Sequence, residues 1–337
     1  MELRYKTCGN GPTDPLYMSN VAELLQDHFT THPCPVEDYR NYNWALEVIR
    51  RYNNKYQQED FKVLEYTSPQ PCHQCKGKGA VQKLNETGEE ESKPCFFCEE
   101  TGQSKMMVEL PFTVDLFWWE GIVPTAALAE GFPAEQIFYS GDGFAKVQIR
   151  VLYCGRIDLP HILDGSLFVM DHKTTSMLGN GFYEQMRMSA QQKGYCWSFE
   201  QLTGQKVRGY QVNTIRVKEP PKYVTEGKAS SRTGKVTTAE SWWDESLQRE
   251  KYLLSDGELN EWHRNTIGLI KEFFWHYQND YFPKKTSWCV SKYGKCTYYD
   301  VCSLFPSEQR GILLHSGNFQ ENKWTPLIEP SQSKQQG

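Results

Sequence analysis

Four cysteines between residues 72 and 98 constrain this 337-residue chain more than any other feature. They form two Cys-x2-Cys pairs, Cys72 with Cys75 and Cys95 with Cys98, separated by 19 residues. Two residues between thiolates let both sulfur atoms turn towards one ion, and this spacing is typical of a four-thiolate zinc site. Because all four ligand positions are filled, the Zn²⁺ is expected to be structural. The alternative is that the four cysteines bind no metal.

The first of these pairs also has glycines in a recognisable pattern. The stretch from Cys72 to Gly79 reads Cys-His-Gln-Cys-Lys-Gly-Lys-Gly and resembles the Cys-x2-Cys-x-Gly-x-Gly repeat of the DnaJ cysteine-rich region. One pair of such repeats is too little to imply a chaperone function. We therefore expect residues 67–105 to form only a zinc-binding insertion.

A second group of cysteines, Cys289, Cys296 and Cys302, lies near the C-terminus. Three thiolates are one short of a four-ligand site, so a fourth ligand must come from elsewhere in the chain. Cys34, which precedes Pro35, is the better candidate, and Cys8 is the other. The spacing alone leaves zinc, an iron-sulfur cluster and three unliganded cysteines open.

Composition excludes several classes of protein. The total of 11 cysteines is odd and no apolar leader follows Met1, which argues against a secreted disulfide framework. No run of 18 apolar residues is present, so we expect no membrane span. The net charge of -5 means that any contact with nucleic acid must be local.

Hydrophobic periodicity predicts alternating helices and strands. Helices are expected at 36–57, at 183–201 with an end near Gly204, and over 244–279. Strands are expected at 61–66, 107–116, 147–159, 167–173 and 207–217, with a turn at Asp164-Gly165.

Charged residues gather at the ends of two of these strands. Asp158 ends one strand, and Asp171 and Lys173 lie two residues apart on the next, so that their side chains share a face. A hairpin between the strands would bring Asp158 beside Asp171. Carboxylate oxygens suit Mg²⁺ or Mn²⁺, and a nearby lysine can orient an attacking water. The alternative is a surface hairpin with a salt bridge.

Three motifs in this order resemble a known nuclease superfamily. Gly155-x-x-Asp158, Asp171-x-Lys173 and Gln191-x3-Tyr195 are similar to the motifs of the PD-(D/E)XK superfamily. The likeness is to the branch with the RecB nuclease domain, the CRISPR adaptation nucleases and many phage exonucleases. Several of those relatives hold an iron-sulfur cluster with one N-terminal and three C-terminal cysteines. The resemblance covers residues 105–217 and the C-terminal cysteine trio.

The resemblance implies an α/β fold, a restriction-endonuclease-like core in which helices flank a mixed central sheet, with an inserted four-cysteine zinc module and a C-terminal helical region carrying the cluster. The implied organisation is an N-terminal helical part (1–66), the zinc-binding insertion (67–105), the catalytic core (106–240), a helical region with the cysteine cluster (241–310) and a tail (311–337).

It also implies roles for single residues. Asp158, Asp171 and the main-chain carbonyl of His172 would bind Mg²⁺ or Mn²⁺, and Lys173 would position the nucleophilic water. Gln191 and Tyr195 would contact substrate or support the lysine, and Glu109, placed on the preceding strand, would lie near the metal or face solvent. Cys34, Cys289, Cys296 and Cys302 would hold a 4Fe-4S cluster.

Two features depart from the family pattern. Many relatives have a metal-binding histidine in an N-terminal helix, and the expected helix at 36–57 contains none. Acidic Glu37 and Asp38 follow Cys34-Pro35, where relatives have basic and aromatic residues. The number of metal ions and the fourth cluster ligand therefore stay open.

A basic segment is the expected site of DNA contact. Residues 206–235 contain eight basic and two acidic residues, a local charge of +6. Within it, 227–234 is rich in Ser, Lys and Gly and is expected to be a mobile loop, and the candidate DNA-binding residues are Lys218, Lys222, Lys228, Arg232 and Lys235. Such a loop can bind phosphates without reading bases, although a merely solvated loop is the alternative.

The sequence thus predicts a cytoplasmic, metal-dependent DNA nuclease of a bacterium or phage-infected cell, an exonuclease serving recombination, repair or replication, with a helicase or recombination protein as a partner. The alternative from another class is a non-catalytic DNA-binding or scaffold protein, in which zinc and a cluster stabilise a degenerate nuclease fold.

Overall fold

The structure is a computed structural model of residues 1–337. It describes residues 17–34, 40–56, 59, 61–64, 66–71, 78–84, 90–94, 101–106, 109–125, 136–176, 178–279, 281–284, 287, 289–291, 294–304 and 308–319. Cys8 and the four cysteines expected to bind zinc, Cys72, Cys75, Cys95 and Cys98, lie outside these residues. The chain divides into two compact units: Met1–Val114 with Cys154–His263, and Asp115–Tyr153 with Arg264–Gly337.

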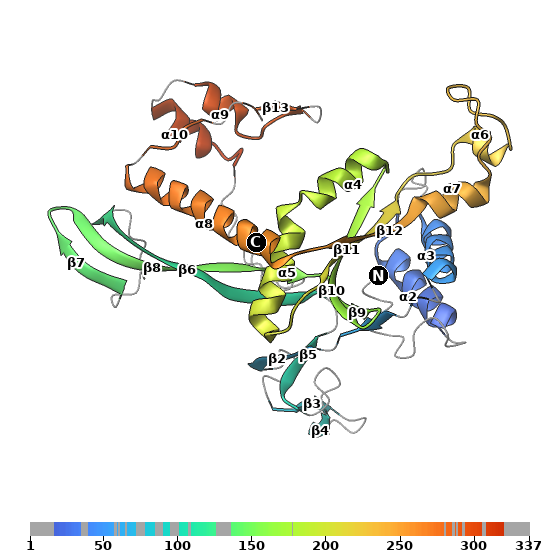
Figure 1. The fold of residues 1–337 in the computed structure, drawn as a ribbon, viewed down its shortest axis with the longest axis horizontal. Coiled ribbons are helices and arrows are strands. Elements are labelled where there is room, and N and C mark those ends of the chain that lie inside the picture. Colours follow the sequence, from blue (N-terminus) through green and yellow to red (C-terminus); the bar gives the residue numbers. More distant parts are fainter. Residues whose placement is uncertain are drawn as a thin grey trace. The chain divides into compact units, whose positions relative to one another are not determined.

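A five-stranded mixed sheet forms the centre of the first unit (Figure 1). Its order is β1 (Phe61–Val63), β9 (Leu159–Leu163), β10 (Ser166–Thr175), β11 (Gly209–Arg216) and β12 (Leu247–Leu253). β10 and β11 are parallel, and the other neighbours are antiparallel. Helices flank this sheet, which confirms the expected mixed α/β class with a mixed central sheet.

Two helices connect the parallel strands β10 and β11. They are α4 (Asn180–Arg187) and α5 (Ala190–Thr203), where the sequence predicted one helix over 183–201. The helix is interrupted because Ser189 is extended, with φ -66° and ψ 127°. α5 ends as predicted at Gly204, whose φ of 68° is a conformation that glycine adopts without a steric penalty.

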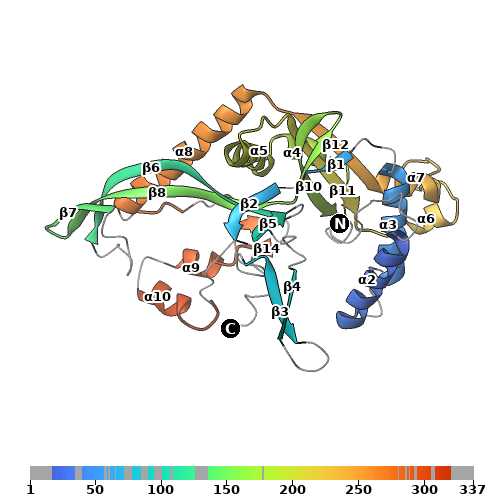
Figure 2. The ribbon, with the colours of Figure 1, turned by 90° about the horizontal axis from the view of Figure 1, so that it is seen from below.

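The other face of the sheet is covered by α3 (Tyr42–Tyr56), next to α2 (Tyr17–Thr31); Figures 1 and 2 show the sheet between α3 and the pair α4 and α5. The side chain of Asn41 caps α3 by accepting a hydrogen bond from the backbone N–H of Trp44 (3.2 Å). α3 shares an apolar cluster with α6 (Lys222–Thr225) and α7 (Ala239–Ser246), made of Val48, Tyr52, Tyr56, Val224, Trp242, Trp243 and Leu247.

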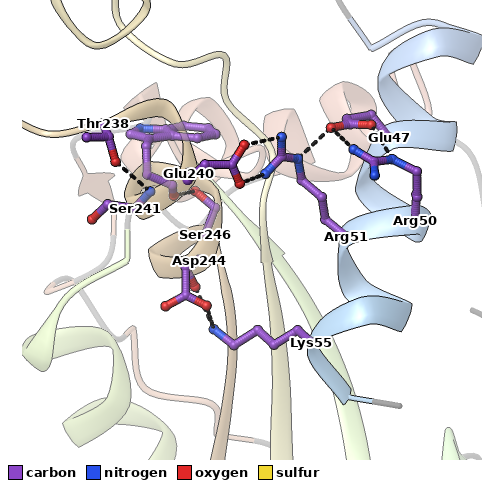
Figure 3. A network of polar contacts seen from close by, with 10 residues as sticks. Glu47, Arg50, Arg51, Lys55, Thr238, Glu240, Ser241, Asp244 and Ser246 are labelled. Carbon is purple, nitrogen blue, oxygen red and sulfur yellow. Dashed lines mark hydrogen bonds and ion pairs between the residues drawn. The ribbon is translucent and has the colours of Figure 1, made fainter. Parts of the chain in front are cut away.

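An ion-pair network reinforces the contact between α3 and α7 (Figure 3). The guanidinium of Arg51 contacts Glu47 of its own helix (2.5 Å) and Glu240 of α7 (2.6 Å). Lys55 pairs with Asp244 of α7 (2.7 Å). The partners on α7 are largely exposed, so each pair contributes at most about 1 kcal/mol and the aromatic cluster supplies most of the packing energy.

The prediction of a helical segment over 244–279 is wrong for residues 247–253, which form strand β12. The helix α8 begins only at Asp256 and continues to Gln278. β12 pairs with β11 over seven residues, and the buried side chain of Leu247 joins the α3 cluster. Pairing with a strand far away in the sequence therefore overrides the local helical pattern of Gln248 to Lys251.

Residues 66–106 contain two antiparallel strand pairs. β2 (Tyr66–Pro71) pairs with β5 (Gln103–Met106), and β3 (Ala80–Leu84) pairs with β4 (Glu90–Pro94). In the described part of the segment expected to bind zinc, β3 and β4 thus lie in the chain between the two paired strands β2 and β5.

The strands β6 (Leu110–Pro124), β7 (Ile137–Gly141) and β8 (Phe144–Ile157) form a sheet in the order β6-β8-β7. All of β7 and the parts of β6 and β8 within 115–153 belong to the second unit. Asp142 and Gly143, both with positive φ (51° and 79°), make the tight turn between β7 and β8. Trp119 of β6 stacks on Phe274 of α8, with 4.2 Å between ring centroids.

The C-terminal part of the second unit contains short elements: β13 (Val290–Ser291), β14 (Gly294–Lys295), α9 (Tyr299–Ser303) and α10 (Glu308–Leu314). In the part of the chain that the structure describes, no helix is both long and apolar enough to cross a membrane.

Candidate active site

A break between two strands positions Asp158. The strand predicted over 147–159 is interrupted at this residue, which lies between β8 and β9. A turn at Asp164 and Gly165, with φ of 50° and 72°, then folds β9 back onto β10. The carboxylate oxygen Oδ2 of Asp158 accepts a hydrogen bond from the backbone N–H of His172 (2.7 Å). The predicted hairpin therefore does bring Asp158 beside the Asp171-x-Lys173 strand.

Gly155, the first residue of the Gly-x-x-Asp motif, allows close packing beneath the site. A Cβ atom at this position would lie 2.9 Å from Cζ of Phe112, which is closer than real Cβ contacts come, and 3.7 Å from Cε1 of Tyr195. The rings of Phe112 and Tyr195 pack edge to face, with centroids 6.0 Å apart. Glycine thus lets this aromatic pair approach the strand that ends at Asp158.

Asp171 is a buried carboxylate with several donors around it. Its side chain is only 2% exposed, and the ammonium of Lys173 lies 2.9 Å from Oδ2. The side-chain amide of Gln192, on α5, donates to the same oxygen (2.7 Å). Burying a charge is costly unless it is paired and hydrogen-bonded, and these contacts supply that compensation.

Lys173 is held from the side of helix α5. Its Nζ atom donates to Oε1 of Gln191 (2.9 Å), and Nε2 of Gln191 donates to the hydroxyl of Tyr195 (3.0 Å). Because a lysine ammonium can only donate hydrogen bonds, the oxygen of the Gln191 amide must face Lys173 and its nitrogen must face away. Gln191 and Tyr195 are one helical turn apart, and the motif aligns both with the lysine.

The carboxylates repel one another electrostatically. Burial raises the pKa of Asp158 from 3.8 to about 6, and the negative charges of Asp171 and Glu109 act in the same direction. The hydrogen bond from the His172 N–H and the charge of Lys173 oppose this shift in pKa. A site that destabilises its own negative charge in this way is one that a cation would stabilise.

Glu109 differs from its predicted place on a strand. It lies just before β6, in a left-handed backbone conformation with φ 52°, which is rare for a residue with a side chain. Its backbone N–H donates to the carbonyl oxygen of Asp158 (2.9 Å). The Glu109 carboxylate lies near enough to the site for its negative charge to raise the pKa of Asp158.

The donor set suits a hard divalent cation. Among the residues that the structure describes, no three His, Cys, Asp or Glu side chains converge into a complete metal site. Mg²⁺ retains several waters and takes only one or two protein carboxylates, so Asp158 and Asp171 with the carbonyl of His172 match its needs. A site for zinc, which prefers nitrogen and sulfur ligands, is not expected here.

The sequence did not identify Gln192 or Asn213. Gln192 is fully buried on Asp171, whereas its neighbour Gln191 is exposed on Lys173. The sequence signal for Gln192 is that it directly follows the motif residue Gln191, so that its side chain projects about 100° further round the same helix. Asn213, on β11, lies 2.8 Å from the ring of His172, and nothing in its local sequence marks it.

The basic segment leaves the sheet at the edge that carries these groups. Because β10 and β11 are parallel, their C-terminal ends meet at one edge, where Thr175 pairs with Arg216. Lys218 follows two residues later. Four further basic residues are exposed: Lys222 lies on α6, Lys228 follows it, and Arg232 and Lys235 lie in a turn closed by a bridge between Ala229 and Val236.

Local structure brings two of the C-terminal cysteines opposite each other. The backbone N–H of Cys296 donates to the carbonyl of Cys289 (2.9 Å) across the β13–β14 hairpin, and Cys302 lies on α9. Cys34 belongs to the other unit, where its Sγ atom contacts the carbonyl of Arg40 (3.1 Å).

No protein-family model matches this chain, and no curated protein matches it either. The interpretation of the site therefore depends on the geometry of its residues.

Proposed function

We propose that this chain is a metal-dependent DNA nuclease of the PD-(D/E)XK type. The observation that supports this most directly is the continuous set of contacts joining Asp171, Lys173 and Gln191. Asp158 is joined to this set by the hydrogen bond that its carboxylate accepts from the backbone N–H of His172, the residue between Asp171 and Lys173. The motif residues come from a strand break, a strand and a helix, and their side chains meet at one place.

In this proposal Asp158, Asp171 and the main-chain carbonyl of His172 would hold Mg²⁺ or Mn²⁺, with Glu109 nearby. When bound, the cation would supply Lewis acidity and offset negative charge at the scissile phosphate. The ammonium of Lys173 would orient the attacking water and stabilise charge on the phosphate oxygens. Gln191 would keep the ammonium aimed at the reaction, since Asp171 alone would draw it towards the sheet.

The basic segment would bind the DNA backbone. Lys218, Lys222, Lys228, Arg232 and Lys235 would supply positive charge beside the active edge of the sheet, without sequence specificity. We further propose an exonuclease that serves recombination, repair or replication in the cytoplasm, with a helicase or recombination protein as partner.

The proposal also includes two metal sites outside the catalytic site. Cys72, Cys75, Cys95 and Cys98 would hold a structural Zn²⁺ in the insertion. Cys289, Cys296 and Cys302, with Cys34 as the fourth ligand, would hold a 4Fe-4S cluster. The backbone hydrogen bond between Cys296 and Cys289 supports a shared role for these two.

A non-catalytic scaffold is the competing function. A scaffold would need only the pairing of Lys173 with Asp171, which offsets the burial of that carboxylate. Lys173 instead has both an anionic and an amide partner. This arrangement favours the enzyme.

The test is an assay of the purified full chain on end-labelled linear DNA and on circular DNA, with Mg²⁺ or Mn²⁺. We expect degradation of the linear DNA, and its loss with EDTA and in Lys173→Ala. A Lys146→Ala variant, on an exposed position of β8, should retain wild-type activity. Activity that is equal in Lys173→Ala and wild type would overturn the proposal.

A further inference from the structure

The face of the central sheet opposite Asp171 and Lys173 has a row of polar residues that the nuclease motifs do not include. His172 pairs with Asn213 on the neighbouring strand, and Asn213 pairs with Arg249 on the next. The three side chains are therefore direct cross-strand neighbours on β10, β11 and β12. We call this row the polar ladder.

Contacts within the polar ladder are specific. Nδ2 of Asn213 lies 2.8 Å from Nδ1 of His172, and Nε of Arg249 donates to Oδ1 of Asn213 (3.4 Å). Because arginine can only donate, the oxygen of the Asn213 amide must face Arg249 and its NH₂ group must face His172. The His172 ring then accepts at Nδ1 and, when neutral, has its proton on Nε2.

Helix α3 holds the far end of the polar ladder. The side chain of Arg249 is only 4% exposed and forms an ion pair with Glu59. Its guanidinium carbon lies 5.2 Å from the ring centroid of Tyr52 and 4.1 Å from that of Tyr56, and the Tyr52 hydroxyl accepts a hydrogen bond from it. A planar, always charged guanidinium that contacts two rings and a carboxylate has little freedom to turn, so Arg249 is a rigid support.

The near end of the polar ladder reaches the active site through the backbone. The N–H of His172 holds the carboxylate of Asp158 (2.7 Å), and His172 lies between Asp171 and Lys173 in the chain. A strand residue whose side chain is fixed on one face has its peptide groups fixed as well. The position of the His172 ring is thus tied to the positions of the groups on the other face.

We propose that Asn213 and Arg249 are positioning residues for the metal-binding edge. They orient the ring of His172 from the opposite side of the sheet and thereby fix the peptide that aligns Asp158. This inference rests on the proposed nuclease function and extends it to residues that touch neither substrate nor metal. Partners of this kind commonly change metal affinity by 10- to 100-fold when removed.

The strand β11 offers a matched control. Gln211 lies two residues from Asn213, on the same face, and both amides are buried, with 4% and 1% of their surface exposed. Gln211 pairs with Met170 and not with His172. Asn213→Leu and Gln211→Leu therefore remove similar buried amides from one strand, and only the first breaks the polar ladder.

The first experiment measures Mn²⁺ binding to the full chain by electron paramagnetic resonance of free Mn²⁺, with folding checked by thermal melts. Asn213→Leu should bind Mn²⁺ about tenfold more weakly, and Gln211→Leu within about twofold of wild type. Arg249→Met should weaken binding too, and the double variant should lose less than the product of the two single losses. Asn213→Ser, a smaller change, provides the same comparison if the leucine variant does not fold.

The second experiment reports on the ring itself. In protein labelled with ¹⁵N-histidine, the His172 signals should show an unprotonated Nδ1 in wild type and a changed tautomer population in Asn213→Leu. Wild-type Mn²⁺ affinity in folded Asn213→Leu would overturn the inference and leave the nuclease proposal standing. A wild-type chain that neither binds Mn²⁺ nor cleaves DNA would overturn the proposed function itself.

Discussion

The ammonium nitrogen of Lys173 lies 2.9 Å from the side-chain oxygen of Gln191, so a residue of helix α5 shares with Asp171 the placement of this lysine. Lys173 is on β10, where Asp171 lies two residues away on the same face. Without the helix, the attraction of the buried carboxylate would dominate the position of the ammonium. The helix therefore keeps the lysine accessible, and 30% of its side chain is exposed.

Replacing Gln191 by alanine should slow catalysis and leave DNA binding almost unchanged. Loss of the Oε1 acceptor lets the ammonium shift towards Asp171, so we expect kcat to fall about tenfold, which is about 1.4 kcal/mol in the activation barrier. KM should change less than about twofold. Steady-state assays with Mg²⁺ measure both, and Gln201→Ala, at an exposed position of the same helix, is the control. An equal loss in both variants would assign the effect to the helix and not to the lysine.

The basic segment should determine how strongly binding depends on salt. In a variant with Lys228, Arg232 and Lys235 all changed to alanine, the slope of log K against log salt should become shallower by about 0.9 for each lost phosphate contact. The cleavage rate of DNA that is already bound should stay near that of wild type, because these exposed side chains are not the groups that hold Lys173 in place, which are Asp171 and Gln191. Fluorescence anisotropy with DNA at several salt concentrations checks the slope.

The matched control for this variant removes the same charge elsewhere, at exposed Lys62, Lys146 and Arg264. If its slope changes as much as that of the basic-segment variant, binding depends on net charge and the proposed contact surface is wrong.

Local patterns were enough to predict much of the candidate site. The parity of Asp171 and Lys173 on a strand, the turn at Asp164 and Gly165, and the helix end at Gly204 are all short-range features, and the structure has them. The hairpin then places Asp158 beside the strand by geometry alone.

Other parts depend on partners far away in the sequence. The apolar residues of 244–279 predict one amphipathic helix, but β12 is a strand because it pairs with β11 and buries Arg249 against tyrosines of α3. The contact between Asn213 and His172 joins residues 41 positions apart. The left-handed conformation of Glu109 depends on its bond to Asp158, which no local rule anticipates.

His161 should make the fold less stable in acid. It is fully buried, and this burial lowers its pKa from 6.5 to about 4. In the unfolded chain the ring takes up a proton near pH 6.5, whereas the folded chain does so only near pH 4, so stability is lost as the pH falls between these values. The difference corresponds to on the order of 3 kcal/mol in the free energy of unfolding.

Urea denaturation at pH 7 and pH 4 tests this. His161→Gln removes the titrating ring, so its free energy of unfolding should fall less than that of wild type over this interval. His28→Gln, at an exposed position of α2, should follow wild type. A His161→Gln variant with the full wild-type acid sensitivity would contradict the assignment.

The two cysteine groups should bind different metals. After anaerobic purification we expect a brown protein with one zinc and four iron atoms per chain. Four cysteines hold one Zn²⁺ in the first site, and four hold one 4Fe-4S cluster in the second. Cys98→Ser should lose zinc alone, Cys302→Ser should lose iron and the visible absorbance, and Cys154→Ser should keep both. Metal analysis with absorption spectra measures this, and a colourless protein with two zinc ions would contradict the cluster.

The central claim is that the carboxylate of Asp171 serves metal-dependent cleavage of DNA. Asp171→Asn keeps the size of the side chain and removes its charge, and Asp115→Asn, at an exposed position of β6, makes the same change away from the site. The decisive measurement is the single-turnover rate of DNA cleavage with saturating Mg²⁺. We expect a loss of at least about 1,000-fold for Asp171→Asn, or about 4 kcal/mol in the barrier, and no loss for Asp115→Asn. Cleavage by Asp171→Asn at the wild-type rate would contradict the account.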